Sequence, residues 1–246
     1  LIPFLKIAPG EMKKIFMVSI TMGIGMYLTL YLALAWTEST ASIAMVTQLE
    51  VPISVLLGFI LLRETTYPLK FVGTVIAFFG ALIISFDPNV IKNLDATFMT
   101  LVSASFYAIS LILIRGLGKV SPITINAWMA IISTIPLLFI SYMLEGGSWH
   151  LINNITLPGW GTLLYSALVG SLIGHGGMYY LLRHYPVGTV APFTLLTPLF
   201  AVIGSIVFLK ETMTIELAFG GLMVLIGVGF VNFTNNQEKL SPSNDS

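Results

Sequence analysis

Residues 62–73 read LRETTYPLKFVG, and residues 209–220 read LKETMTIELAFG. Each segment has Leu, a basic residue, Glu and Thr at the same places, and each ends on Gly. Glu64 and Glu211 differ by 147 positions, and so do Leu62 and Leu209, Thr65 and Thr212, Gly73 and Gly220, and Gly80 and Gly227, while Pro52 and Pro198 differ by 146. We interpret the two segments as copies of one helix–loop–helix unit. The alternative is convergent loop chemistry between two hydrophobic helices.

The composition is that of a membrane protein. Of the 246 residues, 56% are hydrophobic and 9% are charged, and the mean hydropathy is +0.93. A soluble domain carries about 25% charged residues, because it must present a polar surface to water. The formal net charge is zero, so no basic surface is predicted to bind nucleic acid. The absence of Cys excludes disulfides, thiolate chemistry and Cys-ligated metals.

A helix needs about 20 apolar residues to cross the hydrocarbon core of a bilayer. Eight stretches meet this requirement, so the predicted fold is all-α and polytopic. Short connections rich in turn formers separate them, and the polar tail from Thr234 is predicted to be disordered. The predicted spans are 15–36, 41–62, 68–86, 96–114, 123–144, 160–182, 187–209 and 215–233.

Lys and Arg in short loops favour the cytoplasmic side of a membrane. When alternate loops are assigned to one side, that side carries nine basic residues and the other carries two, Lys92 and Lys210. Both termini are therefore predicted to be cytoplasmic. The span 187–209 lies five spans after 41–62, an odd number, so the two copies must face opposite ways. This arrangement is an inverted-topology repeat, which is typical of secondary transporters.

The second copy contains five spans and the first only three, so two further helices are expected before Leu1. The predicted domains are residues 1–86 as a partial first repeat, residues 87–233 as the second repeat and residues 234–246 as the tail.

The stretches STASIAMVTQLEVPISVLLGF (39–59) and LLRETTYPLKFVGTVIAFFGALII (61–84) resemble the EamA-type branch of the drug/metabolite transporter superfamily. So do SASFYAISLILIRGL (103–117) and the segment from Tyr179 to Glu211. The resemblance implies a ten-helix exporter in a bacterial inner membrane, of which eight helices are present here. It implies that 68–86 and 215–233 are peripheral and that the other helices surround a central cavity. VAPFTLLTP (190–198) looks most like exporters of amino acids and related metabolites.

Glu50 is the one acidic side chain predicted deep inside a span. Ionised groups at the bilayer centre cost several kcal/mol, so they tend to face a cavity or a partner. Thr47 and Ser54 are predicted to share its helix face and to hydrogen-bond it, and Pro52 favours a kink. We predict that Glu50 is a protonatable cavity group, that proton exchange drives export and that His175 is a relay. The alternative is a protonated Glu held by structural hydrogen bonds.

Other polar side chains in the spans are candidates for binding substrate or for coupling. His175 can carry a proton near neutral pH, although a lone His among apolar helices is more often a packing residue. The hydroxyls also serve as ordinary interhelical hydrogen bonds. Glu64 and Glu211 are predicted to be structural caps. The full set of candidates is Glu50, Thr47, Ser54, Tyr27, Tyr31, Ser103, Tyr107, His175, Tyr179, Thr194 and Thr197.

The function predicted from these features is a secondary transporter that exports a small metabolite by alternating access. The alternative is an intramembrane enzyme acting on a lipid or peptide, which would need a nucleophile–base pair, paired carboxylates or a metal cluster. A channel would need rings of like residues from several subunits. No cofactor and no metal are predicted. The predicted partners are a small-molecule substrate, the lipid bilayer and protons, and the sequence leaves open whether a homodimer forms.

Overall fold

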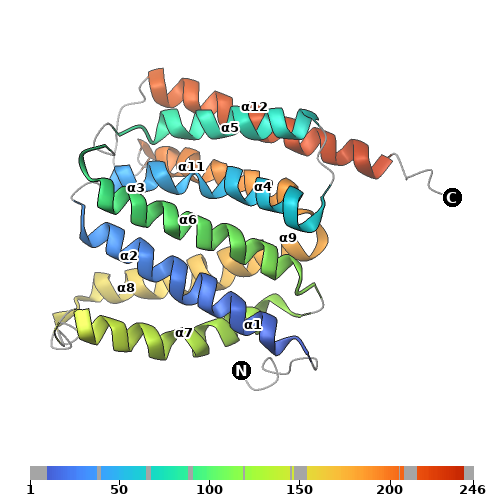
Figure 1. Ribbon diagram of the computed structural model, residues 1–246. Coiled ribbons are helices and arrows are strands. Elements are labelled where there is room, and N and C mark those ends of the chain that lie inside the picture. Colours follow the sequence, from blue (N-terminus) through green and yellow to red (C-terminus); the bar gives the residue numbers. More distant parts are fainter. Residues whose placement is uncertain are drawn as a thin grey trace. The chain divides into compact units, whose positions relative to one another are not determined.

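The computed structural model describes residues 10–37, 40–64, 68–87, 91–118, 120–144, 146, 154–204, 206–207 and 215–240. Within these ranges the elements are helices, and no strand occurs (Figure 1). The predicted all-α class is therefore confirmed. Several predicted features of the repeated connection, namely Thr65, Leu209, Glu211 and Thr212, lie outside the described residues.

Six continuous helical stretches among the described residues, some of them made of several elements, are long and apolar enough to cross a membrane, which makes the chain a polytopic membrane protein. They are Met12–Ala35, Ser42–Leu62, Leu94–Arg115, Pro122–Leu144, Leu157–His184 and Val187–Gly204. Two shorter apolar helices, Pro68–Ile84 and Ala218–Thr234, occupy the remaining predicted spans. That all eight cross the membrane stays a prediction.

The predicted spans 41–62 and 187–209 are not single helices. The first consists of α3 (Thr40–Thr47), a turn and α4 (Glu50–Leu62). The second consists of α10 (Val187–Val190), the 3₁₀ helix η6 (Ala191–Leu195) and α11 (Leu196–Gly204). In both spans an irregular turn or a 3₁₀ segment separates two α-helical pieces.

Each of the two breaks is explained by a proline, which lies four residues after a residue of the turn or of the 3₁₀ segment. Pro52 has no N–H to offer the carbonyl of Gln48, and its ring crowds that carbonyl. Instead, the Val51 N–H donates to Gln48 O over 3.3 Å, and the Leu49 N–H donates to Val46 O over 3.0 Å. These bonds reach back three residues, which tightens the backbone into a 3₁₀-like turn. Pro198 stands in the same relation to Thr194, a residue of η6.

Two other spans contain a π-helical segment. In one, η2 (Ser19–Met26) connects α1 (Met12–Val18) to α2 (Tyr27–Ala35). In the other, η5 (Ser166–His175) connects α8 (Leu157–Tyr165) to α9 (Gly176–His184). π-Helical turns are rare and are frequently found at functional sites. The remaining long spans, α6 (Leu94–Arg115) and α7 (Pro122–Leu144), run without such an interruption.

Helices α5 (Pro68–Ile84) and α12 (Ile215–Leu240) lie side by side, as Figure 1 shows. Their backbones touch at glycines. A Cβ atom on Gly73 would lie 2.6 Å from Gly227 O, and one on Gly80 would lie 2.7 Å from Gly220 O. Since the earlier glycine of each helix meets the later glycine of the other, the two helices run antiparallel.

The C-terminal helix α12 continues to Leu240, seven residues beyond the predicted end of the span at 233. Residues 234–240 are therefore helical, whereas the sequence predicts that the whole tail is disordered. Thr234, the first residue of the predicted tail, is buried, and its hydroxyl donates to Phe230 O of the same helix over 2.9 Å.

The chain forms two compact units, one of residues 1–28 with 113–184 and one of residues 29–112 with 185–246. Each unit takes helices from both predicted repeats, so the compact units and the repeats divide the chain differently. The first unit holds α7 with the two π segments. The second holds both broken spans and the α5–α12 pair.

Candidate functional site

Glu50 is the first residue of α4, where the second half of a broken span begins. Its side chain is half-buried. A helix N-terminus carries a partial positive charge from the aligned peptide dipoles, so the carboxyl group lies at a point that favours negative charge. The break caused by Pro52 thus places Glu50 at a helix N-terminus within the span.

The prediction that Thr47 and Ser54 hydrogen-bond the Glu50 carboxyl is wrong in this conformation. The Thr47 hydroxyl donates to Ala44 O over 2.9 Å. The Ser54 hydroxyl donates to the backbone carbonyl of Glu50 over 2.5 Å. Each hydroxyl has one hydrogen to donate, and both use it on helix carbonyls. The break also interrupts the single helix face that the prediction assumed.

Two threonines of the second broken span were also candidates. The Thr194 hydroxyl donates to Ala191 O over 2.8 Å, within the 3₁₀ helix η6. Thr197 is exposed, one residue before Pro198, which is buried. Both side chains therefore lie at the break, and their role in binding substrate stays a prediction.

Glu64 is a cap, as predicted, and the helix that it caps is α10. Its Oε1 accepts the Val187 N–H over 3.0 Å, and its Oε2 accepts the Gly188 N–H over 3.2 Å. Arg63 ends α4 in the left-handed conformation, with φ 52°, which turns the chain toward this contact. The Glu64 carboxylate thereby satisfies two N–H groups that would have no partner within α10.

In the other unit, Tyr27 and His175 form a hydrogen-bonded pair. The Tyr27 Oη and His175 Nε2 atoms lie 3.1 Å apart. Each residue lies at the C-terminal end of a π segment, because Tyr27 follows η2 and His175 ends η5. Their separation, 175 − 27 = 148, is within one residue of the repeat offset of 147, so they occupy nearly equivalent places in the two repeats, and the structure brings them into contact.

Tyr179 is buried beside this pair. Its ring stacks on His175 with centroids 6.1 Å apart. Its hydroxyl donates to Met22 Sδ over 3.1 Å. Tyr31 is 62% exposed, so the structure does not place it in the same buried cluster.

Helix α7 contacts both π segments through two polar side chains that the sequence analysis did not select. The Asn126 side-chain amide donates to Ser171 O of η5 over 3.4 Å. The Ser133 hydroxyl donates to Ser19 O of η2 over 3.2 Å. Both side chains are buried, and they lie seven residues apart on one face of α7. Two polar residues at that spacing inside an apolar span were a signal that could have identified them.

Ser103 and Tyr107, the candidates on α6, are both buried. Their neighbours on the same helix, Thr100 and Ser110, donate to backbone carbonyls of Ala96 and Phe106 over 2.8 Å and 2.7 Å. Glu50 belongs to the unit of residues 29–112 and 185–246, and His175 belongs to the other unit. The relay from His175 to Glu50 stays a prediction.

Comparisons with known proteins agree with the helical fold. Residues 95–233 match the EamA-like transporter family. An uncharacterized transporter of Archaeoglobus fulgidus is 28% identical over 90% of this chain and 78% of its own length. A protein of Salmonella typhimurium named "Probable amino-acid metabolite efflux pump" is 26% identical over 85% of this chain and 73% of its own.

Two further comparisons are more limited: one covers only part of a relative, and the other concerns only the fold. An uncharacterized transporter of Synechocystis sp. is 32% identical over 114 residues, which are 46% of this chain and 34% of that protein. A solved crystal structure superposes with a TM-score of 0.77 at 13% identity, over 90% of this chain and 77% of the other chain. That likeness concerns the fold alone.

Proposed function

We propose that this chain, which belongs to the EamA-like transporter family, exports a small metabolite, an amino acid or a related compound, by alternating access. The family consists of transporters, so the chain is a membrane transporter and not an intramembrane enzyme. Relatives named as amino-acid metabolite efflux pumps support the substrate class. The further proposal is that the protein lies in a bacterial cytoplasmic membrane with both described ends of the chain on the cytoplasmic side.

The observation that carries this proposal is the equivalent break in two spans. Helix α4 begins at Glu50 and α11 begins at Leu196, and 196 − 50 = 146, the offset that relates Pro52 to Pro198. Discontinuous helices at corresponding places of two repeats are where secondary transporters bind their substrates. The breaks therefore support a binding site near α4 and α11, within the unit that contains both.

Other element boundaries support the inverted repeat. The π segments begin at Ser19 and Ser166, and 166 − 19 = 147, the offset that relates Glu64 to Glu211. The glycine contacts between α5 and α12 are reciprocal, because equivalent glycines exchange partners. Such reciprocity is typical of a contact related by a two-fold axis.

The N-terminus of α4 suggests how protons and substrate would be coupled. Its partial positive charge favours the ionised form of Glu50. An ionised carboxylate attracts the ammonium group of an amino-acid substrate, so substrate and proton would compete for the same group. Substrate that binds on one side would displace the proton, and a proton that binds on the other side would displace the substrate. Exchange of one proton for one substrate follows from this competition.

The export function is tested with proteoliposomes that contain the purified protein and an imposed pH gradient. Vesicles preloaded with a mixture of labelled amino acids are expected to lose one or a few of them faster than protein-free vesicles. A protonophore should remove the part of this loss that the imposed pH gradient drives. Equal loss of every amino acid with and without the protein would contradict the proposed substrate class.

The orientation of the repeats is tested by labelling single cysteines, since the chain has none of its own. Pro68 and Ile215 are equivalent positions and both are exposed. In intact cells, Ile215→Cys is expected to react with an impermeant maleimide, whereas Pro68→Cys is expected to react only after the membrane is permeabilised. The two sites differ because antiparallel helices begin on opposite sides. Labelling of both from the same side would refute the inverted topology.

A further inference from the structure

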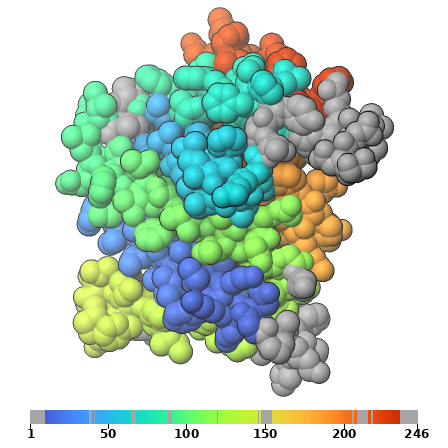
Figure 2. Space-filling model, turned by 45° about the vertical axis from the view of Figure 1, so that its right-hand side comes forward, coloured from blue at the N-terminus to red at the C-terminus, as the bar shows by residue number. Residues whose placement is uncertain are grey.

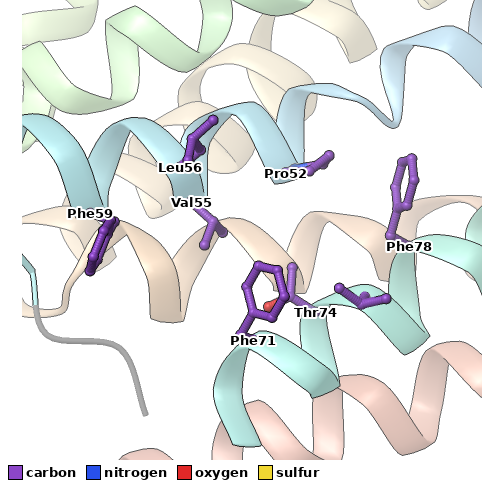
Figure 3. A pocket seen from close by; sticks show the side chains of 8 residues that line it. Pro52, Val55, Leu56, Phe59, Phe71, Thr74 and Phe78 are labelled. Atoms are coloured by element: carbon purple, nitrogen blue, oxygen red, sulfur yellow. The ribbon is translucent and has the colours of Figure 1, made fainter. Parts of the chain in front are cut away.

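A cavity of about 380 Å³ lies between α4 and α5, within one compact unit (Figure 3). Four side chains from each helix line it. Its lining side chains are apolar except for Thr74, whose hydroxyl donates to Lys70 O over 2.9 Å. The cavity therefore offers apolar contacts and no hydrogen-bond donor to a ligand. The lining residues are Pro52, Val55, Leu56, Phe59, Phe71, Thr74, Val75 and Phe78.

The rim of the cavity faces outward. Leu56, Phe59 and Phe71 are each more than half exposed. Figure 2 shows the C-terminal half of α4, in cyan, at the surface. In a chain that spans a membrane, exposed apolar side chains of a span contact lipid tails. A lipid tail can therefore enter this cavity from the bilayer without crossing any polar surface.

A positively charged residue, Arg63, directly follows α4, beyond Phe59 of the cavity lining. Arg63 is exposed and follows Phe59 by four residues, about 6 Å along the helix axis. The turn that carries Arg63 is fixed, because Glu64 beside it is bonded to two N–H groups of α10. A guanidinium group binds phosphate oxygens in two-point fashion. Apolar walls that end at an arginine match the two parts of an anionic phospholipid.

We propose that this cavity binds an acyl chain of an anionic phospholipid whose phosphate is held by Arg63. A zwitterionic metabolite is a poor fit, since its charges would have no partners inside apolar walls. The predicted orientation places the turn after α4 on the cytoplasmic side, where anionic lipids give the membrane surface a negative potential. The inference depends on the membrane location of the chain and not on which metabolite is exported.

The test measures retention of phosphatidylglycerol and phosphatidylcholine by the purified full chain, using native mass spectrometry after detergent washing. Wild type is expected to retain phosphatidylglycerol preferentially. Val75→Phe fills the cavity and should lower that retention at least fivefold. Val72→Phe is the matched control, because Val72 is exposed on the same helix and does not line the cavity.

A second variant tests binding of the lipid headgroup separately from binding of the acyl chain, and it does not disturb packing. Arg63→Gln should remove the preference for phosphatidylglycerol while leaving phosphatidylcholine retention unchanged, and Arg183→Gln should behave as wild type. Equal retention of phosphatidylglycerol by the Val75→Phe and Val72→Phe variants would overturn the proposal. So would loss of metabolite export by Val75→Phe with unchanged lipid retention, since the cavity would then be part of the substrate route.

Discussion

Replacing Gly227 by alanine is expected to destabilise the protein strongly. An added Cβ would lie 2.4 Å from both Gly73 O and Ala77 N, and these are backbone atoms that cannot rotate away. Overpacking typically costs about 1–3 kcal/mol, and a clash with backbone on a neighbouring helix belongs at the upper end of that range. The thermal unfolding temperature in detergent and the monodisperse yield should both fall.

Gly229→Ala is the matched control for this substitution. Gly229 lies on the same helix, is exposed and has no atom within 4 Å of an added Cβ. Alanine is favoured over glycine in a helix by roughly 0.5–1 kcal/mol, so this variant should be as stable as wild type or slightly more stable. If Gly227→Ala unfolds at the same temperature as Gly229→Ala, the close contact between α5 and α12 does not exist in the protein.

Replacing Glu50 by glutamine is expected to abolish transport driven by a pH gradient. Glutamine keeps the size of the side chain and its capacity for hydrogen bonds but cannot ionise. If Glu50 carries the exchanged proton, the variant should still exchange labelled for unlabelled substrate across the membrane. It should no longer accumulate substrate when a pH gradient is imposed. The measurement compares gradient-driven uptake with exchange in the same proteoliposomes.

Glu216→Gln provides the control for the loss of a carboxylate. Glu216 is exposed in the first turn of α12 and lies outside both broken spans. This variant should retain gradient-driven uptake at the wild-type rate. Undiminished gradient-driven uptake by Glu50→Gln would show that Glu50 is not the coupling group and would favour the structural alternative.

The helices could be predicted from the sequence because a spanning segment needs a long apolar run, and this chain has such runs between short polar connections. The repeat was also visible, since Pro52, Glu64 and Gly73 each recur at nearly one offset. Pro52 indicated a kink. It did not indicate that the backbone would tighten at Gln48 and Leu49 and make Glu50 the start of a new helix. That outcome depends on which carbonyls remain available upstream of the proline.

Side-chain contacts were harder to predict than the spans. The hydroxyls of Thr47 and Ser54 donate to nearby helix carbonyls. These carbonyls compete with the Glu50 carboxyl group for the hydroxyl hydrogens, and the prediction considered only which residues share a helix face. The spacing of Asn126 and Ser133 could have marked them as one polar face of α7, but hydropathy does not reveal where a helix widens, so their contacts with the π segments could not be predicted. The Tyr27–His175 contact was not predicted either, although both residues were candidates and lie within one residue of the repeat offset.

The Glu64 cap has a mechanical consequence. Glu64 directly follows the Arg63 turn that ends α4, and its carboxylate grips the first two N–H groups of α10, which lies 123 residues later in the chain. The C-terminal end of one broken span is thereby hydrogen-bonded to the N-terminal end of the other. If α4 tilts, it must pull α10 with it or give up both hydrogen bonds. The two spans are thus mechanically coupled, and the Glu64 side chain helps to transmit a displacement of either one to the other.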